Sequence, residues 1–289
     1  MGVIQYRTND ALDINLPAGD QKLSVNGSDW LWAVTAVYLF IFLAVCSLTF
    51  VARNGEKIFH YIYSIALLVG AVTYFAQASD LAYSVIKTTD QLGNGLTRQI
   101  FFARYINWVV SFPSVILTLG LLSGVSWATI IYNIFLAWFW ILSYISSAYT
   151  TTTYKWGFFA FGTIAWILLA ANTTAHSFKS ASRVGVARDY TILTCWTNLL
   201  WLLYPIAFGL SDGGNKISET SGFIFFGILD ILLIPVLSLC TLFLSRNWDY
   251  NKLNIAFTQY GRVPVSSGSF PEKETAVATP AVPQGGVTV

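Results

Sequence analysis

Seven long apolar stretches divide this chain, and their length decides what it can fold into. Each carries few or no charges over about 20 residues, which is what a helix needs to cross roughly 30 Å of hydrocarbon. Because lipid offers the backbone no hydrogen-bond partner, each stretch must be helical. We predict an all-α membrane protein, a seven-transmembrane-helix bundle. Its predicted spans are 30–52, 58–84, 99–122, 125–148, 154–177, 189–210 and 221–245.

The composition excludes a soluble protein of this length. Hydrophobic residues make up 55% of the 289 residues and charged residues only 10%, against about 25% charged residues in soluble domains. No glycine-rich phosphate loop or nucleophile elbow interrupts the spans. The two histidines have no neighbouring cysteine or acid cluster that would complete a metal site. We expect no enzyme activity, no catalytic residue, no metal and no nucleic-acid partner, with the lipid bilayer as the surroundings.

Basic residues at the span ends predict the orientation. With the N-terminus outside, nine basic residues from Arg53 to Lys273 fall on the cytoplasmic side and six from Arg7 to Lys216 fall outside. Cytoplasmic loops favour Lys and Arg, so we predict N-out/C-in. After about residue 263 the chain is too poor in large apolar residues to fold. The predicted parts are an extracellular N-terminal arm (1–29), a transmembrane domain (30–245) and a cytoplasmic tail (246–289).

Two ionisable residues lie well inside predicted spans, Arg104 in the third and Asp230 in the seventh. A charge in lipid costs several kcal/mol, so such residues face the bundle interior and find a partner. We predict an Arg104–Asp230 pair, direct or through water. It is either the remnant of an ion pathway or a structural pair that fixes helix register, and the sequence favours neither. Asp80, near the outer end of the second span, is predicted to lie at the membrane interface.

Polar side chains follow one face of the third span. Arg104, Asn107, Trp108 and Ser111 share that face at helical spacing. Thr118 returns to it roughly 16 Å deeper, at 1.5 Å per residue. A proton path needs titratable groups at such intervals, whereas an amide and hydroxyls do not hold and release a proton near neutral pH. The third span therefore has the spacing of a proton relay without its acids.

Large side chains lie on one stripe of the sixth span. Trp201, Tyr204, Pro205 and Phe208 follow the steps i, i+3, i+4 and i+7. Packing alone explains such a stripe in a membrane helix. With aromatic residues of the third and fifth spans, it also fits the lining of a flat apolar slot. These further residues are Trp108, Phe158, Phe159 and Trp166. Both interpretations stay open at this point.

Five motifs in this order resemble the microbial (type I) rhodopsin superfamily, and within it the fungal branch. The resemblance covers about residues 30–245, which is all seven predicted spans. The motifs are Arg104-Tyr105 with Trp108 and Pro113, Thr153–Gly157, Trp201–Pro205, Gly209–Asn215 and Gly227–Asp230. The resemblance implies a bacteriorhodopsin-like fold. It places the retinal pocket at Tyr74, Trp108, Phe158, Phe159, Trp166, Trp201, Tyr204, Phe208, Asp230 and Ile234.

The departures from the family pattern concern the residues that handle the proton. The aspartate that accepts the proton in the pumps falls on Asn107, and the acid that donates it from the cytoplasmic side falls on Thr118. The lysine that forms the Schiff base with retinal falls on Ile234. Arg104 keeps its place just outside the pocket. Every lysine lies in a loop, a tail or a helix end, so none replaces the missing one. We predict no cofactor, no covalent retinal and no light-driven pumping.

The chain is most similar to the fungal opsin-related proteins without this lysine, a group that includes heat-shock-induced plasma-membrane proteins. The resemblance implies a multi-pass integral protein of the plasma membrane with a stress-associated role. That role is membrane chaperone or regulator of proton homeostasis, with the plasma-membrane proton ATPase as a partner, and related bundles imply homo-oligomers. Two other classes of function remain open. One is a receptor that binds retinal or another apolar ligand noncovalently, and the other is a passive ion or proton channel.

Overall fold

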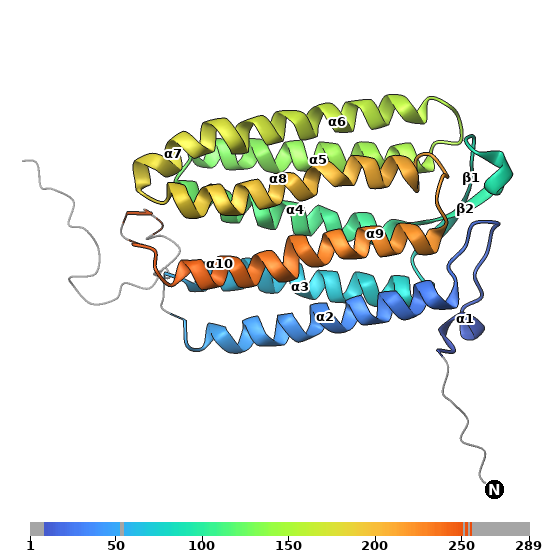
Figure 1. Cartoon of the computed structure of the whole chain (residues 1–289), viewed down its shortest axis with the longest axis horizontal. Helices are drawn as coiled ribbons and strands as arrows, with labels where there is room; N and C mark the ends of the chain where they lie inside the picture. The colour runs from blue at the N-terminus through green and yellow to red at the C-terminus, as the bar shows by residue number, and fades with distance from the viewer. Residues whose placement is uncertain (1–8, 53–54, 251, 254, 256–289) are drawn as a thin grey trace, which may run out of the picture.

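The computed structural model describes residues 9–52, 55–250, 252–253 and 255. Within these residues, seven helical segments are long and apolar enough to cross a membrane, which confirms the predicted bundle. They lie side by side, with a short helix, α1 (Ala11–Ile14), and a β-hairpin at one end and the chain after the last helix at the other (Figure 1). The predicted unfolded tail from about residue 263 lies outside the described residues.

Five of the spans are uninterrupted α-helices. They are α2 (Val25–Thr49), α3 (Lys57–Ala78), α4 (Phe102–Ser123), α5 (Trp127–Tyr149) and α8 (Ala187–Leu210). The fifth and seventh spans each contain a π-helical turn, η2 and η3. The fifth consists of α6 (Lys155–Ala171), η2 (Asn172–His176) and α7 (Ser177–Val184), and the seventh of α9 (Glu219–Ile231), η3 (Leu232–Val236) and α10 (Leu237–Ser245).

Local sequence signals set several helix ends. Ser24, Ser126 and Ser218 precede α2, α5 and α9, and each side chain accepts a hydrogen bond from a backbone N–H of the first turn. Because Ser24 is the cap, the first span starts at residue 25 and not at the predicted 30. Glycines end two helices: Gly124 after α4 and Gly185 after α7 have φ of 66° and 89°, which favours glycine.

The second span ends at Ala78, and the prediction that it reaches residue 84 is wrong. Asp80 and Ala82 have φ of 54° and 60°, a conformation that cannot continue a right-handed helix. The chain then forms an antiparallel hairpin, whose five-residue strands border apolar spans and are easily taken for their ends. The hairpin consists of β1 (Tyr83–Lys87), a short 3-10 turn, η1 (Leu92–Asn94), and β2 (Thr97–Phe101).

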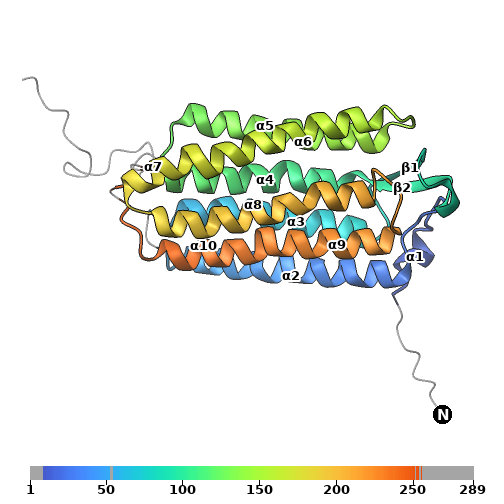
Figure 2. The same cartoon turned by 45° about the horizontal axis from the view of Figure 1, so that its top comes forward.

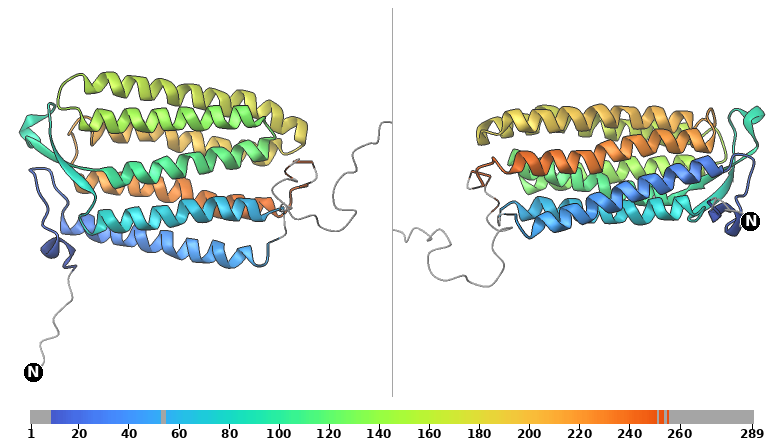
Figure 3. Two further views of the ribbon diagram at one scale, coloured as in Figure 1. Left: turned by 180° about the vertical axis from the view of Figure 1, so that it is seen from behind. Right: turned by 60° about the horizontal axis from the view of Figure 1, so that its bottom comes forward.

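The helix α4 runs through the middle of the bundle. It lies between α3 and α5, with α8 packed across it (Figures 2 and 3). In the most apolar 18-residue stretch of α4, 72% of the residues are buried, against 22% in the fifth span. The outer helices instead expose large apolar side chains, such as Phe40 of α2 and Phe161 of α6, as lipid contact requires. Side chains of α4 are therefore placed to meet several neighbouring helices at once.

Candidate functional site

The candidate site is centred on the carboxylate of Asp230, in the seventh span. Asp230 lies near the end of α9 and is 2% exposed. The hydroxyl of Tyr74 in α3 donates to Oδ2 at 2.5 Å, and that of Tyr204 in α8 donates to Oδ1 at 2.5 Å. Three helices that are distant in the sequence thus meet at one carboxylate. The sequence analysis had placed all three residues in one pocket.

The central helix α4 supplies two further donors to this carboxylate. Nε1 of Trp108 lies 3.1 Å from Oδ1 of Asp230, and Nδ2 of Asn107 lies 3.2 Å from Oδ2. Ser111 donates to Oδ1 of Asn107 at 2.9 Å, which leaves the amide NH₂ group directed at Asp230. The predicted polar face of α4 is therefore present, and it points at the carboxylate.

No described lysine, arginine or histidine forms an ion pair with Asp230. Its carboxylate is surrounded by donors that carry no charge. A hydrogen bond to an ionised group contributes about 1.5–3 kcal/mol, so four such donors offset the cost of several kcal/mol for burying the charge. The backbone carbonyl of Asp230 also accepts a hydrogen bond, from the hydroxyl of Tyr38 at 3.0 Å.

Arg104 pairs with Asp212, and the predicted direct pair with Asp230 is wrong. Nη1 of Arg104 lies 2.8 Å from Oδ2 of Asp212, which also accepts the hydroxyl of Tyr105 at 2.8 Å. The guanidinium lies 4.5 Å from the ring centre of Phe226, one helical turn before Asp230 in α9. Asp212, in the turn after α8, is therefore the carboxylate within reach of the arginine.

Arg104 belongs to a larger group of buried charges at the hairpin end of the bundle. We call this group the outer ion cluster, and it consists of Arg98, Arg104, Asp212 and Glu219. Nε of Arg98 lies 2.5 Å from Glu219 and 3.8 Å from Asp212, and its Nη1 donates to the carbonyl of Ile217 at 2.7 Å. All four side chains are at most 2% exposed. Arg98, Asp212 and Glu219 fall outside the predicted spans, and only the fold brings β2, the turn after α8 and the start of α9 together.

Asp80 is buried just beyond the end of α3, although the sequence predicted an interfacial residue. Both its carboxylate oxygens accept from Nε2 of Gln99 in β2, at 3.1 and 3.3 Å. Burial raises the pKa of Asp80 from 3.8 to about 6, and the hydrogen bond from Gln99 opposes that rise. Asp80 therefore titrates in a mildly acidic range at this end of the bundle.

The predicted aromatic residues of α4 and α8 do come together, around a residue that the sequence analysis missed. The ring of Phe112 in α4 lies 6.0 Å from Trp108, 5.6 Å from Trp201 and 5.1 Å from Tyr204, measured between ring centres. It also lies 5.1 Å from Trp140 of α5. Phe112 follows Trp108 by one turn on the same face of α4, so helical spacing alone was the signal that pointed to it.

A second aromatic group joins α5, α6 and α8. Phe208 lies 4.5 Å from Tyr144 and stacks on Phe159 at 5.8 Å. Trp166, two helical turns after Phe159 in α6, lies 6.3 Å from Trp140 of α5, measured between ring centres. Phe158 is 41% exposed, so its predicted place in the pocket is wrong. Phe158 and Phe159 are consecutive and differ by about 100° around α6, so only one of them can face the bundle interior.

Ile234 lies one helical turn beyond Asp230, in the π-helical turn η3, and is 1% exposed. Its buried side chain carries no polar atom. Thr118, the other deep position of the predicted relay, is buried, and its hydroxyl has no hydrogen-bond partner among the described residues. Lys155, a buried lysine, lies at the start of α6 and pairs with Asp90 at 2.8 Å.

This arrangement of seven helices around a carboxylate has counterparts among known proteins. The family model described as "Bacteriorhodopsin-like protein" matches residues 27–235. The chain belongs to the bacteriorhodopsin-like family. This match confirms the resemblance that the five sequence motifs indicated. Together with the seven apolar helices, it identifies the chain as a multi-pass integral membrane protein.

Fungal relatives and a solved structure extend the comparison. The bacteriorhodopsin-like chain is 33% identical to the opsin-like protein carO of Fusarium fujikuroi, over 94% of this chain and 95% of the relative. It is 29% identical to the 30 kDa heat shock protein of Saccharomyces cerevisiae, over 93% and 89%. The crystal structure of the light-driven proton pump LR (Mac) from Leptosphaeria maculans is 27% identical with a TM-score of 0.75, covering 81% of this chain and 99% of that chain. Similarity therefore extends both to a light-driven pump and to a heat shock protein.

Proposed function

We propose that this chain is a non-photoactive opsin-related membrane protein, with no covalent retinal and no light-driven pumping. The observation that carries the proposal is Ile234. A Schiff base needs a primary amine, and the buried side chain one turn beyond Asp230 is aliphatic. The described lysines lie in loops or near the ends of spans, and Lys155 pairs with Asp90.

The surroundings of Asp230 support the same proposal. Where a bound cofactor would present a positive charge, the carboxylate accepts hydrogen bonds from Tyr74, Tyr204, Trp108 and Asn107. These donors satisfy its oxygens without a cation. Asn107 and Thr118 carry no group that titrates near neutral pH. At these two positions the chain therefore carries neither a proton acceptor nor a proton donor.

Aromatic packing is the third support. Phe112 contacts the rings of Trp108, Trp140, Trp201 and Tyr204 at centre distances of 5.1–6.0 Å. A polyene chain lying between α4 and α8 would have to separate these rings. The residues present therefore do not fit a covalently held retinal.

Light-driven transport gives a direct test. The purified protein is reconstituted in liposomes with all-trans-retinal, and the pH of the medium is followed during illumination. We expect no light-dependent pH change, with a light-driven fungal proton pump as the positive control. A light-dependent change that a protonophore abolishes would refute the proposal.

We further propose a stress-associated role at the plasma membrane, as a membrane chaperone or a regulator of the proton ATPase, and no enzyme activity. The relationship to the 30 kDa heat shock protein supports this role. Deletion of the gene should slow the recovery of cytoplasmic pH after heat or acid stress, and re-expression of the intact chain should restore it. Recovery that is identical with and without the gene, in darkness and in light, would contradict this role.

A second candidate function is noncovalent binding of a flat apolar ligand. One observation favours it: Nε1 of Trp166 and Nε1 of Trp201 are buried without a hydrogen-bond partner among the described residues. A ligand that moved the neighbouring rings apart and presented a carbonyl or hydroxyl would satisfy them. Titration with retinol or ergosterol would then give a saturable change in tryptophan emission that Trp201→Phe weakens, whereas a linear response would dismiss this candidate.

A further inference from the structure

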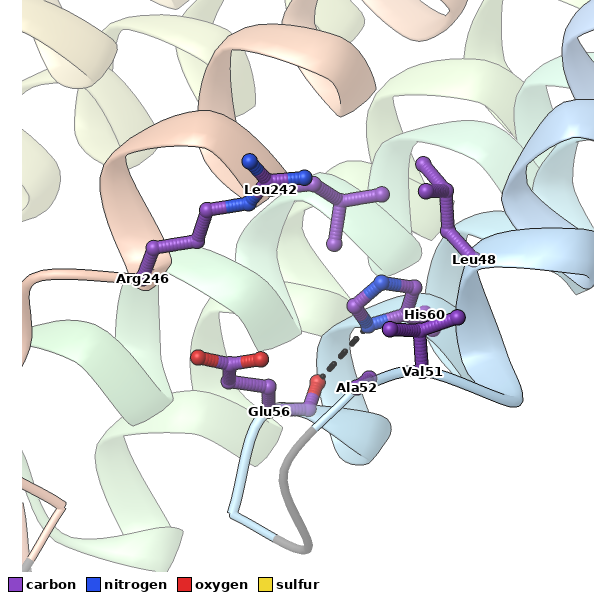
Figure 4. A pocket seen from close by; sticks show the side chains of 7 residues that line it. All are labelled: Leu48, Val51, Ala52, Glu56, His60, Leu242 and Arg246. Atoms are coloured by element: carbon purple, nitrogen blue, oxygen red, sulfur yellow. Dashed lines mark hydrogen bonds between the residues drawn. The ribbon is translucent and has the colours of Figure 1, made fainter.

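A cavity of about 340 Å³ lies at the end of the bundle opposite the β-hairpin, between the ends of α2, α3 and α10. Its size falls in the range of small-ligand pockets, roughly 300–1,000 Å³. It is distant in the sequence and in the fold from the site around Asp230. Figure 4 shows its lining residues, which are Leu48, Val51, Ala52, Glu56, His60, Leu242 and Arg246.

His60 presents a hydrogen-bond acceptor to this cavity. It is 5% exposed, and its Nδ1 lies 3.1 Å from the backbone carbonyl of Glu56. A carbonyl can only accept, so Nδ1 carries the proton and Nε2 of the neutral ring has a free lone pair. Nε2 has no hydrogen-bond partner among the described residues, and it points into the cavity (Figure 4).

Opposite charges line the two sides of the cavity. The carboxylate of Glu56 and the guanidinium of Arg246 approach it from the start of α3 and the end of α10 (Figure 4). Both residues also have further interactions within the chain, and their opposite charges lie at different sides of the cavity. Nε2 of His60 lies on the edge of the ring away from the carbonyl of Glu56, so the cavity offers acceptors at Glu56 and His60 and a cationic donor at Arg246 (Figure 4).

The remaining lining is apolar and lies where hydrocarbon gives way to water. Leu48 is in the last turn of α2, Val51 follows its end, and Leu242 is in the last turns of α10. A phospholipid beside these helix ends presents its phosphate and headgroup at this level. The cavity therefore joins an apolar side, suited to the acyl-chain region, to a polar side with separated charges.

We propose that this cavity binds the phosphoethanolamine group, presented by phosphatidylethanolamine of the bilayer. The ammonium donates to Glu56 and to Nε2 of His60, and the phosphate accepts from the guanidinium of Arg246. A primary ammonium has three N–H donors, whereas the quaternary ammonium of choline has none. Choline is typically held by aromatic rings, and the described lining contains none. The cavity thus selects ethanolamine over choline.

Native mass spectrometry of the purified full-length protein tests this selection. The protein in detergent is offered equimolar phosphatidylethanolamine and phosphatidylcholine with identical acyl chains. We expect about threefold to tenfold more bound phosphatidylethanolamine, the effect of one net hydrogen bond. The preference should fall stepwise with the mono- and dimethylated headgroups. Equal binding of all four lipids, or tighter binding of phosphatidic acid, would overturn the proposal.

Three variants assign the effect to this cavity. Glu56→Gln should abolish the preference between the two lipids, and Arg246→Gln should weaken the binding of both. Arg183→Gln, at an exposed arginine of α7 near the same end of the bundle, should leave both unchanged. An unchanged preference in folded Glu56→Gln would refute the assignment, and if that variant does not fold, the methylation series decides. Soluble O-phosphoethanolamine is tested in the same way. If it raises the melting temperature as much as phosphatidylethanolamine does, the cavity binds the phosphoethanolamine group, but the group comes from a soluble molecule and not from the bilayer.

Discussion

Asp230 accepts hydrogen bonds from four uncharged side chains, two of them at 2.5 Å. A carboxylate in such a setting does not need a nearby cation, because hydrogen bonds to a charged group are stronger than those to a neutral one. The aliphatic side chain of Ile234 therefore does not leave the Asp230 carboxylate unsatisfied. The aspartate stabilises the contact between α3, α4, α8 and α9.

Removing one tyrosine hydroxyl tests whether Asp230 is ionised. Tyr204→Phe keeps the ring and deletes one donor to the carboxylate. We expect it to lower the free energy of unfolding by about 1.5–3 kcal/mol, against about 0.5–1.5 kcal/mol for a hydroxyl bonded to a neutral group. Tyr144→Phe is the matched control, because Tyr144 bonds the neutral hydroxyl of Thr163. Equal losses in SDS-unfolding titrations would show that Asp230 is neutral.

Asp80 should make the stability of the protein depend on pH. Its pKa is raised from 3.8 to about 6, so the folded state binds the proton more tightly than the unfolded state. The stabilisation from that proton is complete below about pH 4 and is lost as the pH rises through about 6.

Asp80→Asn removes this titration. It keeps an acceptor for Gln99 and a residue type that tolerates the left-handed φ of 54°. The difference in melting temperature between variant and wild type should therefore grow in favour of the variant from pH 4 to pH 7. Parallel curves over that range would contradict the burial argument.

Sequence reasoning found those parts of the site that one helix fixes by itself. Asn107, Trp108 and Ser111 share a face because the helical period dictates it. The sequence-based prediction failed where the partner of a side chain depends on how the helices are tilted and on how deep each residue lies in the bundle. Arg104 was paired with Asp230, whereas its guanidinium packs over the ring of Phe226 and its Nη1 lies 2.8 Å from Asp212. No pattern in the sequence states that distance.

At the scale of elements, the β-hairpin after α3 is held to the bundle by the outer ion cluster. Arg98 of β2 reaches Glu219 at the start of α9 and the turn that contains Asp212. The hairpin was not predicted, because its strands are short and border an apolar span. The π-helical turns were not predicted either, although Pro235 inside η3 marks one of them. A proline has no N–H for the helix ladder, so it accompanies such an irregularity.

The outer ion cluster should tolerate the loss of a pair better than the loss of one member. Arg98→Gln leaves Glu219 buried without its closest cation, and we expect a loss of about 3–5 kcal/mol in unfolding free energy. Arg98→Gln with Glu219→Gln removes both charges and should recover much of that loss. Additive losses in a double-mutant cycle would contradict a direct interaction between the two. Arg183→Gln, at an exposed arginine, should change stability by no more than about 0.5 kcal/mol.

At the scale of the whole molecule, the seven-helix frame was predictable and its chemistry was only partly so. Apolar runs of about 20 residues admit one structure in lipid, so all seven spans were found and only their ends were misplaced. The same frame also occurs in the light-driven pump of Leptosphaeria maculans, at 27% identity. The frame alone therefore does not decide between pump and non-pump; in the function proposed above, the side chains at 107, 118 and 234 do.

The most direct test of that account is an absorption spectrum of the purified protein after incubation with all-trans-retinal, repeated after acid denaturation and borohydride reduction. The aliphatic Ile234 predicts the spectrum of free retinal and no retinal retained by the denatured chain. A red-shifted band that borohydride traps on the protein would contradict the account, because it would show that a lysine reaches the pocket.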